Sequence, residues 1–228
     1  MTAYFVTSTG ADIGKTFVTA GLIRHLRGEG RPATALKPLV SGYDSSVVET
    51  SDPAVLLRAM GRSVTADEIA AIAPFRFRAP LSPDLAAARE GRSVDFDALL
   101  GFSRDAVAAH DGTLLIEGVG GIMVPLDECH TVLDWITALS IPAIVMSGSY
   151  LGAISHALTA LDALRGRGLA TAALVVNETP QSSVALDETA ATIARFAAGV
   201  PVITLPRLAQ AEQPHPAIER LTELLDRF

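Results

Sequence analysis

The sequence predicts an α/β fold: a doubly wound, mostly parallel sheet with helices on both faces. Three observations predict it. Short β-rich runs alternate with longer amphipathic or alanine-rich segments along the 228 residues. A small-residue loop joins the first run to the first helix, and polar or glycine residues follow most of the runs. Parallel neighbours need a right-handed crossover, usually through a helix, so this alternation favours a parallel sheet.

The predicted elements follow one another in chain order, and each has a simple basis. The predicted strands are short runs rich in apolar and β-branched residues: 3–7, 33–36, 113–116, 143–146, 172–176 and 202–205. The predicted helices have apolar residues at helical spacing or are rich in alanine: 15–28, 53–60, 96–109, 131–139, 153–165, 185–197 and 216–228. Segment 63–92 breaks the alternation with three prolines, so we expect an excursion over one end of the sheet. We find no internal repeat or linker, and we expect a single domain over residues 1–228.

The composition predicts a soluble, globular protein of the reducing cytoplasm. Hydrophobic residues make up 49% of the chain, and the longest apolar runs, such as 141–146, are about a third of the length that spans a bilayer. The N-terminus has no basic segment before an apolar one, so no leader is expected. The single cysteine, Cys129, excludes an internal disulfide, and the formal charge of −7 argues against nonspecific binding to nucleic acid or to an anionic membrane.

Residues 8–16, Ser-Thr-Gly-Ala-Asp-Ile-Gly-Lys-Thr, lie between the first predicted strand and the first predicted helix. Successive backbone NH groups and the positive end of a helix dipole would surround one anion here, which favours a nucleotide triphosphate. Lys15 would reach the outer phosphates, and the Thr16 hydroxyl would bind magnesium. The usual spacing places a glycine five positions before Gly14, where this chain has Thr9, so the loop is irregular.

Charged residues follow other predicted strands, at the edge where parallel sheets bind ligands. Lys37 follows the second strand, and its ammonium would face the triphosphate; a solvated surface lysine is the alternative. Glu117 ends a strongly apolar run, where an unpaired carboxylate is costly to bury, so we expect a metal or a cationic partner. Asp52 and Glu117, with Thr16, would supply the hard oxygen ligands that magnesium prefers, although an N-cap role alone would also explain Asp52.

Two other chemistries are not supported by the residue spacing. Cys129 and His130 form an isolated pair and the other histidines are scattered, so we find no zinc-binding set. The segment Ser147-Gly148-Ser149 lacks the spacing of a nucleophile elbow.

Short motifs occur in a defined order along nearly the whole chain. They are Tyr4-Phe5-Val6-Thr7 into Gly14-Lys15-Thr16, Lys37-Pro38, Ser41-Gly42, Ser51-Asp52, Ser82-Pro83, Glu90-Gly91, Glu117-Gly118, Gly120-Gly121, Asp134-Trp135, Leu151-Gly152, His156 and Asn177. In order and spacing, they resemble the dethiobiotin synthetase family, ATP-dependent carboxylases that close the ureido ring in biotin synthesis. The resemblance implies a doubly wound fold of the P-loop NTPase type. It also implies ATP and Mg²⁺ as cofactors, and a homodimer with its substrate site at the subunit boundary.

The resemblance further implies a role for each matching residue. Lys15 and Lys37 would bind the phosphates and the developing charge, and Ser41 would touch the substrate. The nucleotide would contact Asp12, Ile13, Gly14, Lys15, Thr16, Phe17, Glu117, Asn177 and Pro206. Asn177 would recognise adenine, a plain turn residue being the alternative, and magnesium would be held by Thr16, Asp52 and Glu117. The substrate carboxylate would bind across the dimer at the predicted helix start Gly152, Ala153, Ile154 and Ser155.

The implied substrate is 7,8-diaminopelargonic acid, together with CO2. One amine captures CO2 as a carbamate, and the carbamate oxygen attacks the γ-phosphate of ATP to give a carbamic-phosphoric anhydride. The second amine then closes the ring and expels phosphate, which yields dethiobiotin. Positioning and charge neutralisation suffice for such a phosphoryl step, so lysines and magnesium are expected rather than a covalent nucleophile.

Several positions depart from the family pattern, mostly where the substrate would bind. Serine stands where glycine is usual at Ser8, and alanine where threonine is usual at Ala11. The other departures are Asp84 for histidine, Tyr150 for lysine, Ser155 for asparagine and Thr189 for tyrosine. A nucleotide-binding paralogue with a different substrate is therefore an alternative.

Two rival classes share the expected fold. A partition-type regulatory ATPase carries a second lysine early in the loop, where this chain has Gly10, and its membrane-targeting helix would be basic, whereas segment 218–225 is acidic. An amidotransferase of the same superfamily normally appends a glutaminase domain with a cysteine nucleophile. We do not expect this chain, at 228 residues, to contain that domain.

Overall fold

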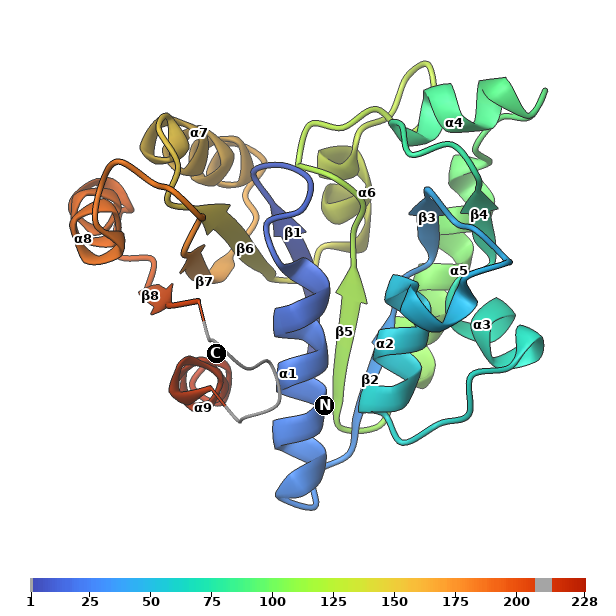
Figure 1. Ribbon diagram of the computed structural model, residues 1–228, viewed down its shortest axis with the longest axis horizontal. Helices are drawn as coiled ribbons and strands as arrows, with labels where there is room; N and C mark the ends of the chain where they lie inside the picture. The colour runs from blue at the N-terminus through green and yellow to red at the C-terminus, as the bar shows by residue number, and fades with distance from the viewer. Residues whose placement is uncertain (1, 208–214) are drawn as a thin grey trace.

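The computed structural model describes residues 2–207 and 215–228. Its main sheet has six strands in the order β2-β5-β1-β6-β7-β8 (Figure 1). The strands are β1 (Thr2–Ser8), β2 (Ala33–Leu36), β5 (Thr113–Glu117), β6 (Ala143–Gly148), β7 (Thr171–Asn177) and β8 (Val202–Leu205). All neighbours in this sheet pair in parallel, so the predicted doubly wound fold is confirmed.

Helices cover both faces of the sheet. On one face α1 (Lys15–Gly28) lies between α2 (Asp52–Ala59) and α9 (Pro216–Leu225), as Figure 1 shows. The other face carries α5 (Phe96–Ala109) packed on α6 (Val132–Leu139), and α7 (Ala153–Gly166) packed on α8 (Leu186–Phe196).

Two adjacent residues of the central strand β1 show why both faces must be covered. The Tyr4 hydroxyl donates to the Leu225 carbonyl of α9 at 2.8 Å, whereas Phe5 packs edge-on against Trp135 of α6, with ring centroids 4.8 Å apart. Neighbouring side chains of a strand point to opposite faces. Because both rings are almost completely buried, each face needs its own helical layer.

The excursion expected over 63–92 has more structure than the sequence predicted. It contains the helices α3 (Ala66–Ile72) and α4 (Pro83–Arg89) and the strand β4 (Phe75–Phe77). β4 pairs in parallel with β3 (Leu39–Ser41) to form a separate two-stranded sheet, and a short 3₁₀ helix, η1, covers Val48–Thr50. Strands of three residues are too short to show an alternating pattern, and for that reason the sequence analysis missed them.

The other predicted elements agree with the structure except at their ends. The last helix ends at Leu225 rather than at residue 228, and β6 extends to Gly148, two residues beyond the predicted strand. Among the described residues, no helix has both the length and the apolar character needed to cross a membrane.

Two consecutive buried hydrogen bonds run from α6 into α5, two helices that pack together on one face of the sheet. The Trp135 indole N–H donates to Ser103 Oγ at 3.2 Å, and the Ser103 hydroxyl donates to the Leu99 carbonyl at 2.8 Å. Replacing Ser103 with alanine is expected to lower the free energy of unfolding by about 1–3 kcal/mol, because a buried indole N–H is left without an acceptor. Urea denaturation checks this, with the exposed neighbour Asp105→Ala as the control; equal stabilities of the two variants would contradict it.

Candidate active site

The loop between β1 and α1 presents an open helix start. Gly14, the N-cap residue of α1, has a φ of 90°, a conformation that favours glycine, and no described side chain caps this helix. A Cβ at this position would lie 2.5 Å from the Asn177 amide nitrogen. The first backbone NH groups of α1 are therefore left for a ligand, as the predicted phosphate site requires.

Lys15 begins α1, and its ammonium lies against the loop. It donates to the Gly120 carbonyl at 2.9 Å, to Ser8 Oγ at 3.0 Å and to the Gly10 carbonyl at 3.3 Å. Two effects lower the pKa of Lys15 to about 8: the larger is burial, and the second is repulsion by the Lys37 ammonium. An incoming triphosphate would bring negative charge close to this ammonium and favour its protonated form.

Glu117, at the end of β5, joins two residues that are distant in the sequence. Its Oε1 atom accepts from the Thr16 hydroxyl at 2.6 Å and from the Lys37 ammonium at 2.6 Å. The sheet order explains the meeting, because β5 lies between β2, which Lys37 follows, and β1, which the phosphate loop follows. The sequence predicted a metal or a cationic partner for Glu117, and in the structure Lys37 is the cationic partner.

Lys37 is buried, so it is not the solvated surface lysine that the sequence left as an alternative. Its ammonium also lies 2.6 Å from Asp52 Oδ2. Burial alone would lower the pKa of Lys37, but the charges of Glu117 and Asp52 outweigh it and raise this pKa above its ordinary value. The ammonium therefore keeps its charge at neutral pH.

Asp52 is not the N-cap of α2, the alternative that the sequence allowed. Ser51 is the N-cap, and its hydroxyl accepts from the Ala54 N–H at 3.4 Å. Burial raises the pKa of the Asp52 carboxyl, but the charge of Lys37 and the hydrogen bond that its ammonium donates outweigh burial and hold this pKa below its ordinary value. Asp52 thus presents an ionised carboxylate toward Lys37.

These oxygen atoms fit a magnesium ion. Glu117 Oε2 is buried without a hydrogen-bond partner among the described residues, which leaves an anionic oxygen available as a ligand. Thr16, Asp52 and Glu117 offer one hydroxyl and two carboxylates, and Mg²⁺ is usually bound by one or two carboxylates together with water and phosphate oxygens. Among the described residues, no group of three or more His, Cys, Asp and Glu could hold a metal. The fit is therefore to magnesium beside a phosphate rather than to a protein-only site.

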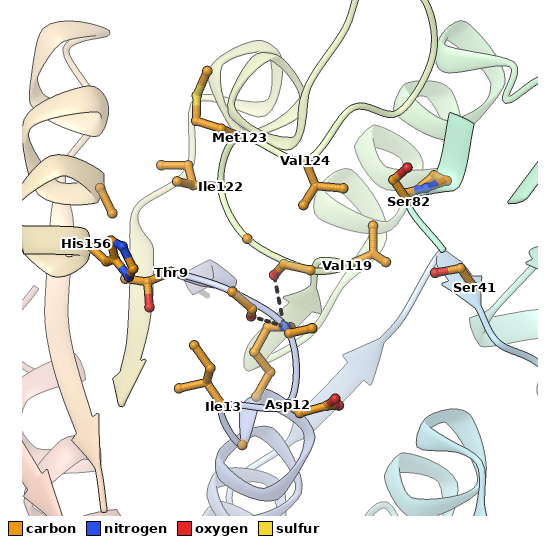
Figure 2. A pocket seen from close by; sticks show the side chains of 18 of the residues that line it. Thr9, Asp12, Ile13, Ser41, Ser82, Val119, Ile122, Met123, Val124 and His156 are labelled. Carbon is orange, nitrogen blue, oxygen red and sulfur yellow. Dashed lines mark hydrogen bonds between the residues drawn. The ribbon is translucent and has the colours of Figure 1, made fainter. Parts of the chain in front are cut away.

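A cavity of about 1050 Å³ opens above these groups. Figure 2 shows Asp12 and Ile13 of the phosphate loop on one side of it, with Ser41 and Ser82 on another and His156 on a third. The remaining wall is largely apolar and comes from the segment after β5: Val119, Ile122, Met123 and Val124 (Figure 2). The cavity thus combines a charged floor with an apolar wall.

The structure brings most of the predicted site residues to this cavity. Its lining includes Asp12, Ile13, Gly14, Lys15, Thr16, Phe17, Lys37, Ser41 and Asp52. Glu117 is fully buried beneath it. Asn177 and Pro206 do not line it in the described part of the chain, but the Asn177 amide donates to the Ile13 carbonyl at 3.0 Å and so touches the phosphate loop.

The predicted carboxylate site is only adjacent to this cavity. Among the described residues, those from Gly152 to Ser155 do not line it, whereas His156, one residue further along α7, does. The His156 ring nitrogen Nδ1 is 2.9 Å from the Tyr150 hydroxyl. The sequence analysis missed the apolar wall because those residues lie in a loop with no regular period.

One feature of composition supports the importance of this site. Of the 18 basic residues in the chain, only Lys15 and Lys37 are lysines, and both are buried here. A lysine ammonium is a compact point charge suited to phosphate. The chain therefore places both of its lysines next to the phosphate loop.

A phosphate loop between the first strand and first helix of a parallel sheet, with a threonine and a carboxylate placed for magnesium, defines a P-loop NTPase. In agreement, the model of the AAA domain family matches residues 2–215. The chain belongs to the ATP-dependent dethiobiotin synthetase family, as its relatives show. It is 49% identical over 202 residues to ATP-dependent dethiobiotin synthetase BioD of Acidiphilium cryptum (strain JF-5), covering 88% of this chain and 91% of the relative.

A second relative supports this assignment, and a solved structure shows the same fold. The enzyme of the same name from Methylobacterium nodulans is 49% identical over 212 residues, with 91% of this chain and 94% of the relative covered. The cell division ATPase MinD of Pyrococcus furiosus is only 16% identical, with a TM-score of 0.60 and 100% and 99% coverage of the two chains, and it shows the shared fold alone. The sequence-based predictions of family, ligase class and cofactors, ATP with Mg²⁺, are confirmed at the level of the family.

Proposed function

We propose that this protein carboxylates 7,8-diaminopelargonic acid with CO2 and closes the ring to dethiobiotin, using ATP and Mg²⁺. The proposal rests on family membership and on one observation in particular. The Thr16 hydroxyl and the Lys37 ammonium both lie 2.6 Å from Glu117 Oε1, beside the phosphate loop. This arrangement has the charges required to bind a triphosphate and a divalent ion together.

The proposed reaction has three steps. One substrate amine adds to CO2 and loses a proton, which gives a carbamate. A carbamate oxygen attacks the γ-phosphorus of ATP, so that a carbamic-phosphoric anhydride forms and ADP leaves. The second amine attacks the carbonyl carbon and loses a proton as the ring closes, and the C–O bond to phosphate breaks to release inorganic phosphate.

The residues of the site would carry these steps by positioning and charge. The NH groups of the phosphate loop and Lys15 would bind the phosphates, while Lys37 would stabilise the charge that develops on the transferred phosphoryl group. Thr16, Asp52 and Glu117 would hold Mg²⁺, which when bound neutralises phosphate charge. Ser41 would contact the carbamate end of the substrate, and Asn177 and the backbone at Pro206 would contact adenine.

The rest of the substrate is a hydrocarbon chain that ends in a carboxylate. We assign the hydrocarbon chain of the substrate to the apolar wall around Ile122 and Met123, because burying its methylene groups there is favourable. The carboxylate would bind at the start of α7, Gly152 to Ser155, contributed by the second subunit of a homodimer. Helix starts favour anions. We also propose a cytoplasmic location, because ATP is available in the cytoplasm and a free thiol such as Cys129 stays reduced there.

The test is phosphate release from ATP, measured with and without 7,8-diaminopelargonate and bicarbonate. We expect phosphate release to depend on both compounds. Mass spectrometry should identify one dethiobiotin for each phosphate released. Release that ignores the diamine would reject the proposal and favour a paralogue with another substrate. Dependence on lipid or DNA instead would indicate a partition-type ATPase.

A further inference from the structure

The Lys15 ammonium has all of its hydrogen-bonding capacity engaged by the protein. An ammonium carries three N–H donors. Their acceptors are the carbonyls of Gly120 and Gly10, at 2.9 Å and 3.3 Å, and Ser8 Oγ at 3.0 Å. Two acceptors are backbone groups, which most residues would supply at those positions. The third is a side chain, so the residue at position 8 decides whether it exists.

The Ser8 hydroxyl is itself held between two backbone carbonyls. Its oxygen lies 2.6 Å from the Gly10 carbonyl and 2.7 Å from the Gly120 carbonyl, and the residue is fully buried. Carbonyl oxygens can only accept, so the single hydroxyl proton points toward one of these two carbonyls or is shared between them. The lone pairs of the oxygen are thereby directed at Lys15.

The backbone around this hydroxyl is also closely packed. The Ile122 N–H donates to the Ser8 carbonyl at 2.9 Å, which ties the loop after β5 to the end of β1. A Cβ added to Gly121 would lie 3.1 Å from backbone atoms of Thr9 and Gly10, so the two loops approach at a distance that suits glycine. The carbonyls that orient Ser8 are therefore held in place by the fold.

We propose that Ser8 is a positioning residue for Lys15, holding its ammonium between the phosphate loop and the loop after β5. The hydrogen bond to the Gly10 carbonyl is the longest of the three. We expect it to break when a phosphate oxygen accepts a hydrogen bond from that N–H group. Ser8 and Gly120 then keep the ammonium in place during phosphoryl transfer. In so far as it concerns turnover, this inference rests on the proposed function.

Steady-state kinetics of the Ser8→Ala variant test the inference. We expect kcat to fall about tenfold, because a displaced charge stabilises the transition state poorly, while KM for ATP changes less than threefold, since the loop NH groups still bind the triphosphate. Ser8→Thr keeps the hydroxyl and should restore kcat. A wild-type kcat in Ser8→Ala, or a change confined to KM, would overturn the proposal.

Ser147→Ala is the matched control. Ser147 is another fully buried serine, near the end of the neighbouring strand β6, and its hydroxyl donates only to the Gly148 carbonyl, at 3.3 Å, within the described residues. Wild-type kcat in this variant supports a specific role for Ser8. An equal loss in both variants would mean that packing, rather than the hold on Lys15, is responsible, and would overturn the proposal.

A second measurement separates this inference from the proposed function. Acetic anhydride labels lysines, and the chain has only Lys15 and Lys37, so mass spectrometry of the ligand-free protein reports both rates. We expect Ser8→Ala to raise the labelling rate of Lys15 at least threefold relative to Lys37, which Glu117 and Asp52 still hold. An unchanged ratio overturns the role of Ser8. A wild-type protein without diamine-dependent phosphate release would reject only the proposed function.

Discussion

Replacing Lys37 with alanine is expected to reduce turnover by about 10²- to 10³-fold, while ATP affinity changes less than tenfold. Lys37 lies outside the phosphate loop, so the loop NH groups and Lys15 still bind the triphosphate. What the variant lacks is a fixed ammonium beside the group that gains charge during phosphoryl transfer. Steady-state kcat and calorimetric titration with ATP measure the two effects separately.

Stability has to be followed in the same variant. Removing one partner of a buried ion pair costs about 3–5 kcal/mol, because Glu117 is left charged and fully buried. Mg²⁺ should recover part of this loss, since a divalent ion can replace the missing cation. Lys37→Met keeps the aliphatic stem and is the control for packing: it should lose as much turnover as Lys37→Ala. Turnover within threefold of wild type in a folded Lys37→Ala protein would remove Lys37 from the chemistry.

Replacing Glu117 with glutamine is expected to raise the Mg²⁺ concentration for half-maximal rate by about 10- to 100-fold. Glutamine keeps the shape of the side chain but removes the negative charge that attracts the ion and pairs with Lys37. Turnover at saturating Mg²⁺ should also fall, because Lys37 loses one of the two carboxylates that hold its ammonium at 2.6 Å.

Thermal unfolding provides a readout without turnover. Mg²⁺ and ADP should stabilise the wild-type protein more than Glu117→Gln, because only a ligand that binds the folded state raises its stability. Glu188→Gln, on the exposed surface of α8, is the matched control and should behave as wild type. An unchanged Mg²⁺ requirement in Glu117→Gln would exclude this carboxylate as a ligand.

Local features of the chain were predicted reliably from the sequence. The alternation of apolar runs and amphipathic segments gave the six strands of the main sheet, because burial on both faces of a parallel strand leaves a continuous apolar run. The phosphate loop was recognisable because its small residues, lysine and threonine are adjacent. Glu117 stood out since a carboxylate at the end of an apolar run demands a partner.

Other features could not be predicted because no local pattern accompanies them. The pair of strands β3 and β4 depends on two three-residue segments that meet only in the folded chain. Ser51 rather than Asp52 caps α2, because Ser51 has the extended backbone of an N-cap residue and Asp52 is already helical. The sequence does not distinguish between these two adjacent residues. The three acceptors of Lys15 come from both loops, so the role we infer for Ser8 could not be derived from the spacing in the sequence.

The sequence alone determined which chemical groups are available and in what order: two lysines, a threonine and two carboxylates. Only the tertiary structure decided which of them meet. Thr16 and Glu117 are 101 residues apart in the sequence, and Lys37 and Glu117 are 80 apart. Yet the Thr16 hydroxyl and the Lys37 ammonium each lie 2.6 Å from Glu117 Oε1. The physical reason is strand order, because insertion of β5 between β2 and β1 brings three strand ends to one edge, and an alternating pattern does not specify which strands are neighbours.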